Sequence, residues 1–245
     1  MNTHTFTFII GYRHSLEKFN NLKRTLDWIN GFAGVDVILV EQDTHSKISH
    51  LPLKARQVFL KSNKPYNKAW GFNVGTKLSK SNVIVFSDLG IIMDPNQFIE
   101  GLKLIEQYDM VSPYKKQIEL QQNESGLQLP DILNIDRFGR EKLICESLCI
   151  FRKDAIQRIG GWYEELIGNG EDEFLSNKVK QFLNWTELEQ KGYQLYYNRE
   201  IPNMVLQQRN LQLLQTLNNL SKEDLIKSIN LSMPKNSQIN KYDNF

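Results

Sequence analysis

The stretch VIVFSDLG, residues 83–90, decides the fold of this chain. Its first four residues are apolar and mostly β-branched, which predicts a buried β-strand over Val83–Phe86. Asp88 follows closely, so a carboxylate stands at the carboxyl end of that strand. In open α/β sheets, ligands bind beyond the carboxyl ends of the strands. We therefore expect an α/β protein whose functional edge contains Asp88.

Strand and helix patterns alternate around this central strand. Apolar, β-branched runs predict further strands over 6–10, 35–40 and, more briefly, 57–60. Helices are expected over 15–30, over 67–78 and after the Asp94-Pro95 start. Apolar residues at helical spacing predict the buried faces of the first and third helices: Leu16, Phe19, Leu22, Leu26 and Ile29, then Phe98, Ile99, Leu102 and Ile105. This order predicts a mostly parallel central sheet flanked by helices.

The second half of the chain is less regular. Residues 113–142 are polar and rich in helix breakers, and we expect a long functional loop there. A strand is predicted over 143–151, a helix over 171–184 and a late strand over 193–197. Leucines at helical spacing then predict an amphipathic helix: Leu211, Leu214, Leu217 and Leu220. We divide the chain into a domain over 1–205 and a C-terminal helical extension and tail over 206–245.

Composition excludes several classes of protein. The 245 residues contain 30 basic and 28 acidic side chains, and a net charge of +2 gives no reason to expect a nucleic-acid partner. Cys145 and Cys149 lack the second ligand pair of a structural zinc site and are expected to be reduced thiols. No apolar run approaches the length of a membrane span, and the N-terminus has no signal pattern. We expect a cytoplasmic protein, with peripheral membrane contact if the substrate is a lipid.

A second acidic signal lies further along the chain. GEDE at residues 170–173 places three adjacent carboxylates behind the flexible pair Gly160-Gly161. Acids in a first helical turn are commonly solvated side chains that complement the helix dipole. Here they follow a glycine pair and accompany an acidic strand end, where an acid or base could face a substrate. The two signals together indicate an enzyme that transfers a sugar, with Asp88 and Asp172 facing each other across one cleft.

Four stretches in this order resemble glycosyltransferases of the GT-A fold, in particular the β-1,4-galactosyltransferases of family 7 and the bacterial family 2 enzymes. Residues 8–13 look like the first strand and donor loop, although Gly11 stands where proline is usual. Residues 66–75 are similar to the helix that follows the nucleotide pocket. Residues 85–90 look like the Asp-x-Asp strand end, and residues 151–173 are similar to the catalytic segment. The resemblance spans roughly residues 6–180 and implies the GT-A fold.

The resemblance implies a glycosyltransferase that moves a hexose or N-acetylhexosamine from a nucleotide sugar, with UDP as the expected nucleotide, to a glycan or glycolipid. Inversion by a single displacement is expected, with Asp172 as general base and Glu171 holding the acceptor. The acceptor is expected against residues 113–142 and against Trp162, Asn169, Gly170 and Glu171. For Trp162 the sequence leaves two roles open, a platform for the sugar or a cover for the sheet.

The resemblance places the donor against the ends of the first strands and the start of the 67–78 helix. The implied donor residues are Gly11, Tyr12, Arg13, Asp43, Tyr66, Lys68, Asn73, Asp88 and Gly90. Asp43 is equally expected as a turn residue. Packing at the rim of the core is the commoner role for aromatic residues such as Tyr12 and Tyr66.

The metal site of the family is incomplete in this sequence. Residues i and i+2 of an extended segment point the same way, so Asp-x-Asp can hold one Mn²⁺ or Mg²⁺ ion. Asp88 is present, but Gly90 has no side chain, and no histidine stands near Gln207-Gln208, where relatives place a further ligand. We expect weak or no metal dependence. A cationic side chain would then replace the ion, with Arg13, Lys68 and Arg209 as candidates.

Two other classes of function share features of this sequence. A GT-A domain that binds a nucleotide sugar or glycan without turnover is the main alternative, because the metal ligands are missing. A sugar-phosphate nucleotidyltransferase shares the strand order but needs a glycine-rich, basic loop after the first strand. Residues 11–17 lack that loop, which disfavours this class.

Overall fold

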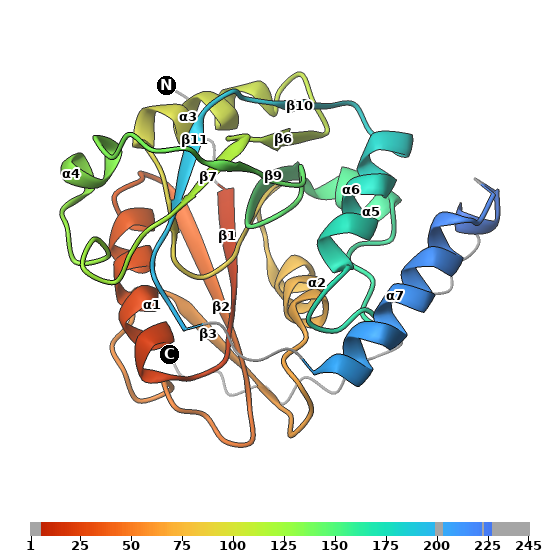
Figure 1. Cartoon of the computed structure of the whole chain (residues 1–245), viewed down its shortest axis with the longest axis horizontal. Coiled ribbons are helices and arrows are strands. Elements are labelled where there is room, and N and C mark those ends of the chain that lie inside the picture. The colour runs from red at the N-terminus through yellow and green to blue at the C-terminus, as the bar shows by residue number, and fades with distance from the viewer. Residues whose placement is uncertain (1–5, 199–202, 222, 227–245) are drawn as a thin grey trace.

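The computed structural model describes residues 6–198, 203–221 and 223–226. A seven-stranded sheet runs through the molecule (Figure 1). Its strand order is β10 (Trp185–Glu187), β6 (Met110–Ser112), β9 (Leu148–Arg152), β4 (Val83–Ser87), β1 (Phe6–Tyr12), β2 (Val35–Asp43) and β3 (Arg56–Lys61). The predicted central position of the 83–86 strand is confirmed, since β4 is the middle strand of the seven.

The sheet is mostly parallel, as predicted. β1 pairs in parallel with β2 and with β4, so that Phe6 lies opposite Val35 on one side and Val83 on the other. β9 is the exception, because it runs antiparallel to both β4 and β6. β9 also begins later than the predicted 143–151 strand, at Leu148, because residues 143–147 form a turn. That turn lies beside the end of β4, where the amide of Asp88 donates to the carbonyl of Ser147 over 2.5 Å.

Helices cover both faces of this sheet (Figure 1). On one face α1 (Leu16–Ile29) and α3 (Pro95–Leu104) pack against Phe8 and Ile10. On the other face α2 (Lys68–Leu78), α5 (Lys153–Arg158) and α6 (Glu171–Phe182) pack against Ile9. The alternation of Phe8, Ile9 and Ile10 between two cores is what a strand buried on both faces requires.

The predicted helix faces are mostly correct. Leu22, Leu26 and Ile29 are buried, and Ser15 caps α1 by accepting from the amide of Lys18. Three leucine or isoleucine positions were predicted wrongly: Leu16, Ile99 and Leu211 are exposed. Leu16 is the first residue of α1 and lies before the helix reaches the core.

A second, smaller sheet replaces much of the loop predicted for residues 113–142. Its strand order is β5 (Ile91–Ile92), β11 (Lys191–Gln194), β7 (Lys116–Glu119) and β8 (Arg140–Glu141). With α4 (Leu129–Leu133) it encloses a core of its own around Ile118, Ile132 and Tyr193. The prediction of a long loop is therefore wrong in part. Elements of two to five residues are too short to show periodicity in the sequence.

The last described helix is α7 (Met204–Asn218), which packs beside α6 at the edge of the molecule (Figure 1). Leu214 and Leu217 bury against Leu166 and Phe174. The division at residues 205–206 falls inside the first turn of α7 and stays a prediction. None of the described helices is long and apolar enough to cross a membrane.

Candidate active site

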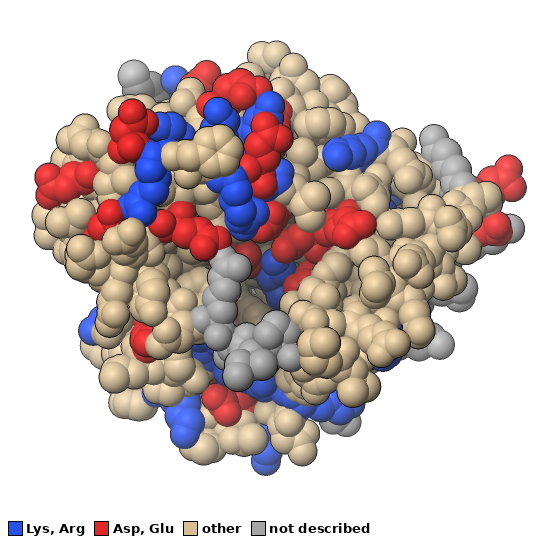
Figure 2. All heavy atoms as spheres, in the orientation of Figure 1, with Lys and Arg blue, Asp and Glu red and all other residues tan. Residues whose placement is uncertain are grey.

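A cleft of about 550 Å³ opens at the carboxyl ends of β1 and β4. Its walls come from the segment before α2, the turn before β9, and the starts of α6 and α7. Figure 2 shows acidic and basic side chains side by side around a hollow near the centre of this face. The volume lies in the range of pockets that bind small molecules, ~300–1,000 Å³.

The cleft gathers most of the residues predicted from the sequence. Its lining includes Gly11, Tyr12, Arg13, Tyr66, Lys68, Asp88, Asn169, Glu171 and Asp172. The expectation that Asp88 and Asp172 face each other across one cleft is confirmed, because the side chain of Lys68 contacts both. The roles assigned to these residues stay predictions.

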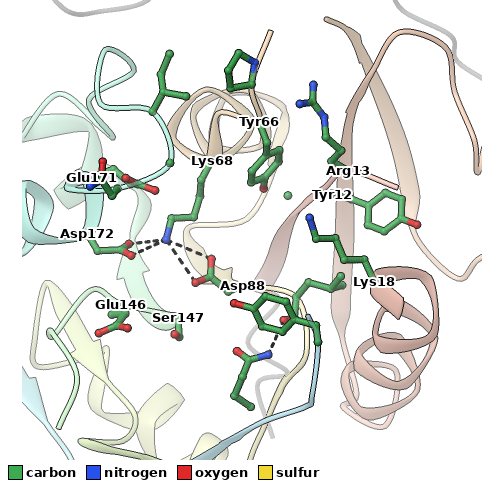
Figure 3. A pocket seen from close by; sticks show the side chains of 18 of the residues that line it. Tyr12, Arg13, Lys18, Tyr66, Lys68, Asp88, Glu146, Ser147, Glu171 and Asp172 are labelled. Carbon is green, nitrogen blue, oxygen red and sulfur yellow. Dashed lines mark hydrogen bonds and ion pairs between the residues drawn. The ribbon is translucent and has the colours of Figure 1, made fainter. Parts of the chain in front are cut away.

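Lys68 is the centre of this arrangement (Figure 3). Its Nζ lies 2.7 Å from each of the two carboxylate oxygens of Asp172 and 3.4 Å from those of Asp88. The Lys68 side chain is only 10% exposed, against 19% for Asp172 and 30% for Asp88. Beneath the pair, Nζ lies 5.5 Å from the ring centroid of Trp162, close enough for a cation–π contact. One buried ammonium therefore bridges the two acidic segments.

Local sequence alone would not place a lysine here. Lys68 is the first residue of α2, and the side chain of Asn67 caps that helix by accepting from the amide of Trp70. A cation at a helix N-terminus opposes the helix dipole. Burial acts to lower the pKa of Lys68, but the carboxylates of Asp172 and Asp88 outweigh it, and the pKa lies well above its ordinary value. The acids facing Lys68 are what allow it to stay charged.

Burial raises the pKa values of two of the acids in this cluster, Asp88 and Glu171. Burial raises the pKa of Asp88 to about 6, against the attraction of Lys68 and with a further contribution from the charge of Asp172. Burial likewise raises the pKa of Glu171 to about 7, again opposed by Lys68. Because the cluster holds three carboxylates and one ammonium, it is poised to hold a proton near neutral pH.

Glu171 has an unusual environment for an acid at the start of a helix. Glu171 is only 6% exposed, and its Oε2 has no hydrogen-bond partner within the described parts of the chain. The preceding Gly170 adopts φ 87°, a left-handed conformation that favours glycine and turns the chain into α6. A buried carboxylate oxygen without a donor costs ~1–3 kcal/mol or more. A donor supplied by a ligand in the cleft would remove that cost.

The start of α6 is held in place from α7. Asn210 is buried, and its side-chain nitrogen donates to the carbonyl of Ile167 over 2.8 Å and to the side-chain oxygen of Asn169 over 2.6 Å. Ile167, Gly168 and Asn169 line the cleft. The C-terminal helix therefore positions one wall of the site.

The opposite wall explains the glycine that departs from the family pattern. A Cβ at Gly11 would lie 1.9 Å from the hydroxyl of Tyr66, so a larger residue there would force the tyrosine ring to shift. Arg13 donates to the carbonyls of Gln42 over 3.0 Å and Lys64 over 2.7 Å, which fixes its guanidinium at the rim. Tyr66 and Arg13 thus form a preorganised pair at the end of β1.

Several lining residues were not predicted. They include Lys18, Asn21, Glu146, Ser147, Gln194 and Gln207, whereas Gln117 and Arg140 belong to the 113–142 segment expected to face the acceptor. Ser147 adopts φ 65°, a conformation that is rare outside glycine and that clusters at functional sites. Gln207 lies near the position where the related glycosyltransferases place a further metal ligand, and this chain has an amide side chain there. No pattern in the sequence distinguishes these residues, because they converge from α1, the second sheet, the turn before β9 and α7.

Five predicted site residues do not line the cleft: Trp162, Asn73, Asp43, Gly90 and Gly170. Trp162 is 1% exposed and packs between Phe72 and Phe86, so it covers the sheet and is no sugar platform. Asn73 instead holds the chain at Trp162, donating to its carbonyl and accepting from its amide.

The other three have local backbone roles. The Asp43 carboxylate accepts from the amide of Thr44 in the turn after β2. Gly90 adopts φ 84° in the turn after β4, where its amide donates to Thr25. Gly170 acts through the conformation described above. Arg209, a candidate cation, is exposed and likewise lies outside the cleft lining.

The donor set is a poor fit for Mn²⁺ or Mg²⁺. Asp88 contributes one carboxylate, and the described residues contain no cluster of three His, Cys, Asp or Glu arranged to hold a metal. His14, near the cleft, is hydrogen-bonded to the hydroxyl of Tyr12. The ammonium of Lys68 already lies between Asp88 and Asp172, where it would repel a second cation.

No protein-family profile matches the chain, and no curated protein matches its sequence. Its structure is similar to that of S. aureus TarS, a GT-A glycosyltransferase, with 16% identity and a TM-score of 0.60 over 94% of this chain and 70% of that chain. A TarS structure in complex with UDP gives 15% identity and a TM-score of 0.61 over the same shares, 94% and 70%.

A third similar structure is the Drosophila β-1,4-galactosyltransferase 7, in a mutant complex with manganese, UDP-Gal and xylobiose. It gives 12% identity and a TM-score of 0.52 over 84% of this chain and 79% of that chain. At such low identities the likeness shows the fold alone. The chain has the GT-A fold that the sequence motifs predicted, and this expectation is confirmed.

Proposed function

We propose that this chain is an inverting glycosyltransferase that transfers a hexose or N-acetylhexosamine from a UDP-sugar to a glycan or glycolipid acceptor. The observation that carries the proposal is the Asp88–Lys68–Asp172 cluster at the floor of a cleft in a GT-A fold. The similar structures bound to UDP and UDP-Gal support the choice of donor. The xylobiose in one of them supports a glycan acceptor.

In this proposal the donor lies along the wall formed by Tyr12, Arg13 and Tyr66. The fixed guanidinium of Arg13 and the ring of Tyr66 would contact the nucleotide, and Lys68 would face its diphosphate. Charge-assisted hydrogen bonds from an ammonium to phosphate oxygens are among the stronger protein–ligand contacts. Stabilising the leaving diphosphate is the task that a metal ion performs in other enzymes, and Lys68 is the chain's own cation at that place.

Asp172 is the proposed general base. It takes the proton from an acceptor hydroxyl while that oxygen attacks the anomeric carbon from the face opposite the diphosphate. The bond from the anomeric carbon to the phosphate oxygen breaks, and its electron pair leaves with UDP. A positioned base of this kind contributes ~10²- to 10⁴-fold.

The acceptor is proposed to lie between Glu171 and the second sheet. The unpartnered Oε2 of Glu171 would accept from a second hydroxyl of the acceptor. Gln117 and Arg140 reach the cleft from β7 and β8, within the 113–142 segment that was expected to handle the acceptor. Arg140 is oriented by a two-pronged contact with Glu146.

A divalent cation has no assigned step here. The donor set around Asp88 is a poor fit for Mn²⁺ or Mg²⁺, and Lys68 supplies a positive charge in its place. A chelator should therefore leave substantial activity. Complete loss with chelator and recovery with manganese would show that the Asp88 site was interpreted wrongly.

The direct test is a screen of nucleotide sugars for slow hydrolysis, run with and without divalent cations. We expect hydrolysis of one or a few UDP-sugars by the wild-type protein and its loss in Asp172→Asn. Equal rates in mutant and wild type would refute the role of Asp172. Absence of any nucleotide-sugar binding would refute the proposed function as a whole.

One observation favours a second candidate, a GT-A module that binds without turnover. Both oxygens of Asp172 are engaged by Lys68, so the proposed base is occupied in this structure. A titration with UDP-sugars separates the two. Tight binding with no hydrolysis or transfer, with or without metal, would establish the binding module.

A cytoplasmic location forms part of the proposal. Cys145 and Cys149 are both buried free thiols, which suits a reducing compartment. A peripheral contact with a membrane would accompany a lipid-linked acceptor.

A further inference from the structure

The ion pair between Lys68 and Asp172 blocks the proposed base. An ammonium has three N–H donors, and Lys68 directs them at Asp172, at 2.7 Å to both oxygens, and at Asp88. A carboxylate oxygen that already accepts from a cation is a weak acceptor for the proton of a neutral hydroxyl. While Asp172 is paired with Lys68, it is therefore a poor base. Asp88 is the more distant partner of Lys68, at 3.4 Å.

The same ammonium is the cation that faces the donor. Arg13 is committed to two backbone carbonyls and Arg140 to Glu146, while Lys18 lines the cleft from α1. Lys68 lies between the donor wall and α6 (Figure 3) and carries the flexible stem that lets an ammonium move by an ångström or more. A diphosphate brings more negative charge than one carboxylate, so it competes with Asp172 for Lys68.

We propose that Lys68 is a latch: it pairs with Asp172 while the cleft is empty and transfers to the diphosphate when the donor binds, which frees the base. The proposal rests on the proposed function and adds a binding order to it. Donor must bind first, because only then are the oxygens of Asp172 open to an acceptor hydroxyl. No bond is made or broken in this step, since it exchanges one ion pair for another.

The latch predicts that Asp172 and UDP compete for the same ammonium. Removing the carboxylate in Asp172→Asn should therefore tighten the binding of UDP, by about fivefold or more. Glu173→Gln is the matched control, because Glu173 is an exposed acid in the same helical turn and lies outside the cleft lining. It removes the same charge without touching Lys68 and should leave the affinity for UDP unchanged.

A double-mutant cycle on the affinity for UDP isolates the contribution of Lys68. Lys68→Met alone leaves two carboxylates without a cation, so it is the variant most exposed to unfolding. Lys68→Met with Asp172→Asn removes both partners of the buried pair, which proteins tolerate better. We expect the double variant to bind UDP at least tenfold more weakly than Asp172→Asn, and the tightening caused by Asp172→Asn to be absent in the Lys68→Met background.

The outcomes separate the latch from the proposed function. If wild-type protein does not bind UDP at all, the proposed function fails. If it binds UDP but Asp172→Asn and Glu173→Gln have the same affinity, the latch is refuted and the donor site stands. If Asp172→Asn tightens binding equally with Met at position 68, the effect is general electrostatics and the latch is again refuted. Should Lys68→Met not fold, the comparison of Asp172→Asn with Glu173→Gln still decides.

Discussion

Two of the helices that begin at the cleft, α2 and α6, carry opposite charges in their first turns. α6 begins with Glu171, Asp172 and Glu173, whereas α2 begins with Lys68 and has no acid in its first turn. Because a helix N-terminus carries about half a positive charge, acids stabilise it and a lysine does not. α2 tolerates its lysine because the start of α6 lies opposite, and α6 can turn Glu171 and Asp172 into the cleft because of that lysine. The charges at the start of each helix are therefore balanced by those at the start of the other.

The two starts also differ in their caps. The side-chain oxygen of Asn67 caps α2 by accepting from the amide of Trp70. Its side-chain nitrogen donates to the carbonyl of Glu164 over 2.8 Å. Gly170 precedes α6 with no side chain at all, in a left-handed conformation. α2 thus begins at a side-chain cap, whereas α6 begins at a left-handed glycine, and hydrogen bonds from Asn210 hold the residues just before it. A place where two elements break local rules and compensate for each other is where a functional site is expected.

The largest expected effect is on activity at the α6 start. Asp172→Asn should lower the rate of donor hydrolysis or sugar transfer by ~10²- to 10⁴-fold, because an amide cannot take the hydroxyl proton. Glu173→Gln, one residue further along the same turn, should keep the wild-type rate. A comparable loss in both variants would mean that the charge of the turn, and not a base, matters.

The next effect is on stability at the α2 start. Lys68→Met should lower the free energy of unfolding by ~3–5 kcal/mol, because it leaves buried carboxylates without a cation. Urea denaturation at neutral pH measures this loss. Lys77→Met, at an exposed position in the last turn of the same helix, should change stability by no more than ~0.5 kcal/mol. Restoration of most of the loss on adding Asp172→Asn would confirm that the two helix starts stabilise each other, and no restoration would contradict it.

A smaller effect should depend on pH. Burial raises the pKa of Glu171 to about 7 from 4.5, with Lys68, Asp172 and Asp88 facing it. The folded state then binds more protons than the unfolded state between these values, so stability falls as pH rises through this window. Glu171→Gln removes that cost and should raise the free energy of unfolding by ~1–3 kcal/mol at pH 8. Below pH 4.5 this gain should vanish.

Thermal or urea unfolding of Glu171→Gln across pH 4 to 8 tests this sign. Glu173→Gln, exposed in the same turn, supplies the baseline and should show no such pH dependence. A gain from Glu171→Gln that grew towards acid pH would contradict the assignment of a buried, protonatable carboxyl to residue 171.

The smallest effects concern the caps. Asn67→Ala should destabilise by ~1–2 kcal/mol, because it removes the cap on the amide of Trp70. Gly170→Ala should cost ~1 kcal/mol for its left-handed conformation alone, since a Cβ there meets other side chains only at 3.6 Å and beyond. Chemical denaturation compares the two. A Gly170→Ala cost larger than that of Asn67→Ala would reverse the contrast between side-chain and backbone capping.

The sequence predicted the parts of this molecule that repeat a local pattern. β1, β2 and β4 are long apolar runs, and Ser15 and Asp94 are recognisable caps, so these elements were found close to their observed bounds. β7 and β8 have four and two residues, too few to show alternation, and the antiparallel direction of β9 depends on pairing between distant segments. For Trp162 the sequence left two roles open, because this residue lies outside a helix or strand whose periodicity would indicate a buried face.

Within the site, the acids were easier to predict than their partner. Asp88 and Asp172 stand at a strand end and a helix start, positions that a sequence reveals. Lys68 was one of three candidate cations, and nothing in its neighbourhood distinguished it from Arg13. Its role follows from contacts with residues far away in the chain. Ser147 was missed because its left-handed conformation is imposed by the turn before β9.

The most direct test of the central claim, that Lys68 serves as the internal cation of a nucleotide-sugar site, is a calorimetric titration of UDP in the presence of EDTA. We predict saturable binding by the wild-type protein in chelator, with an affinity that added manganese changes little. Binding that requires manganese, or no binding under either condition, would contradict the account.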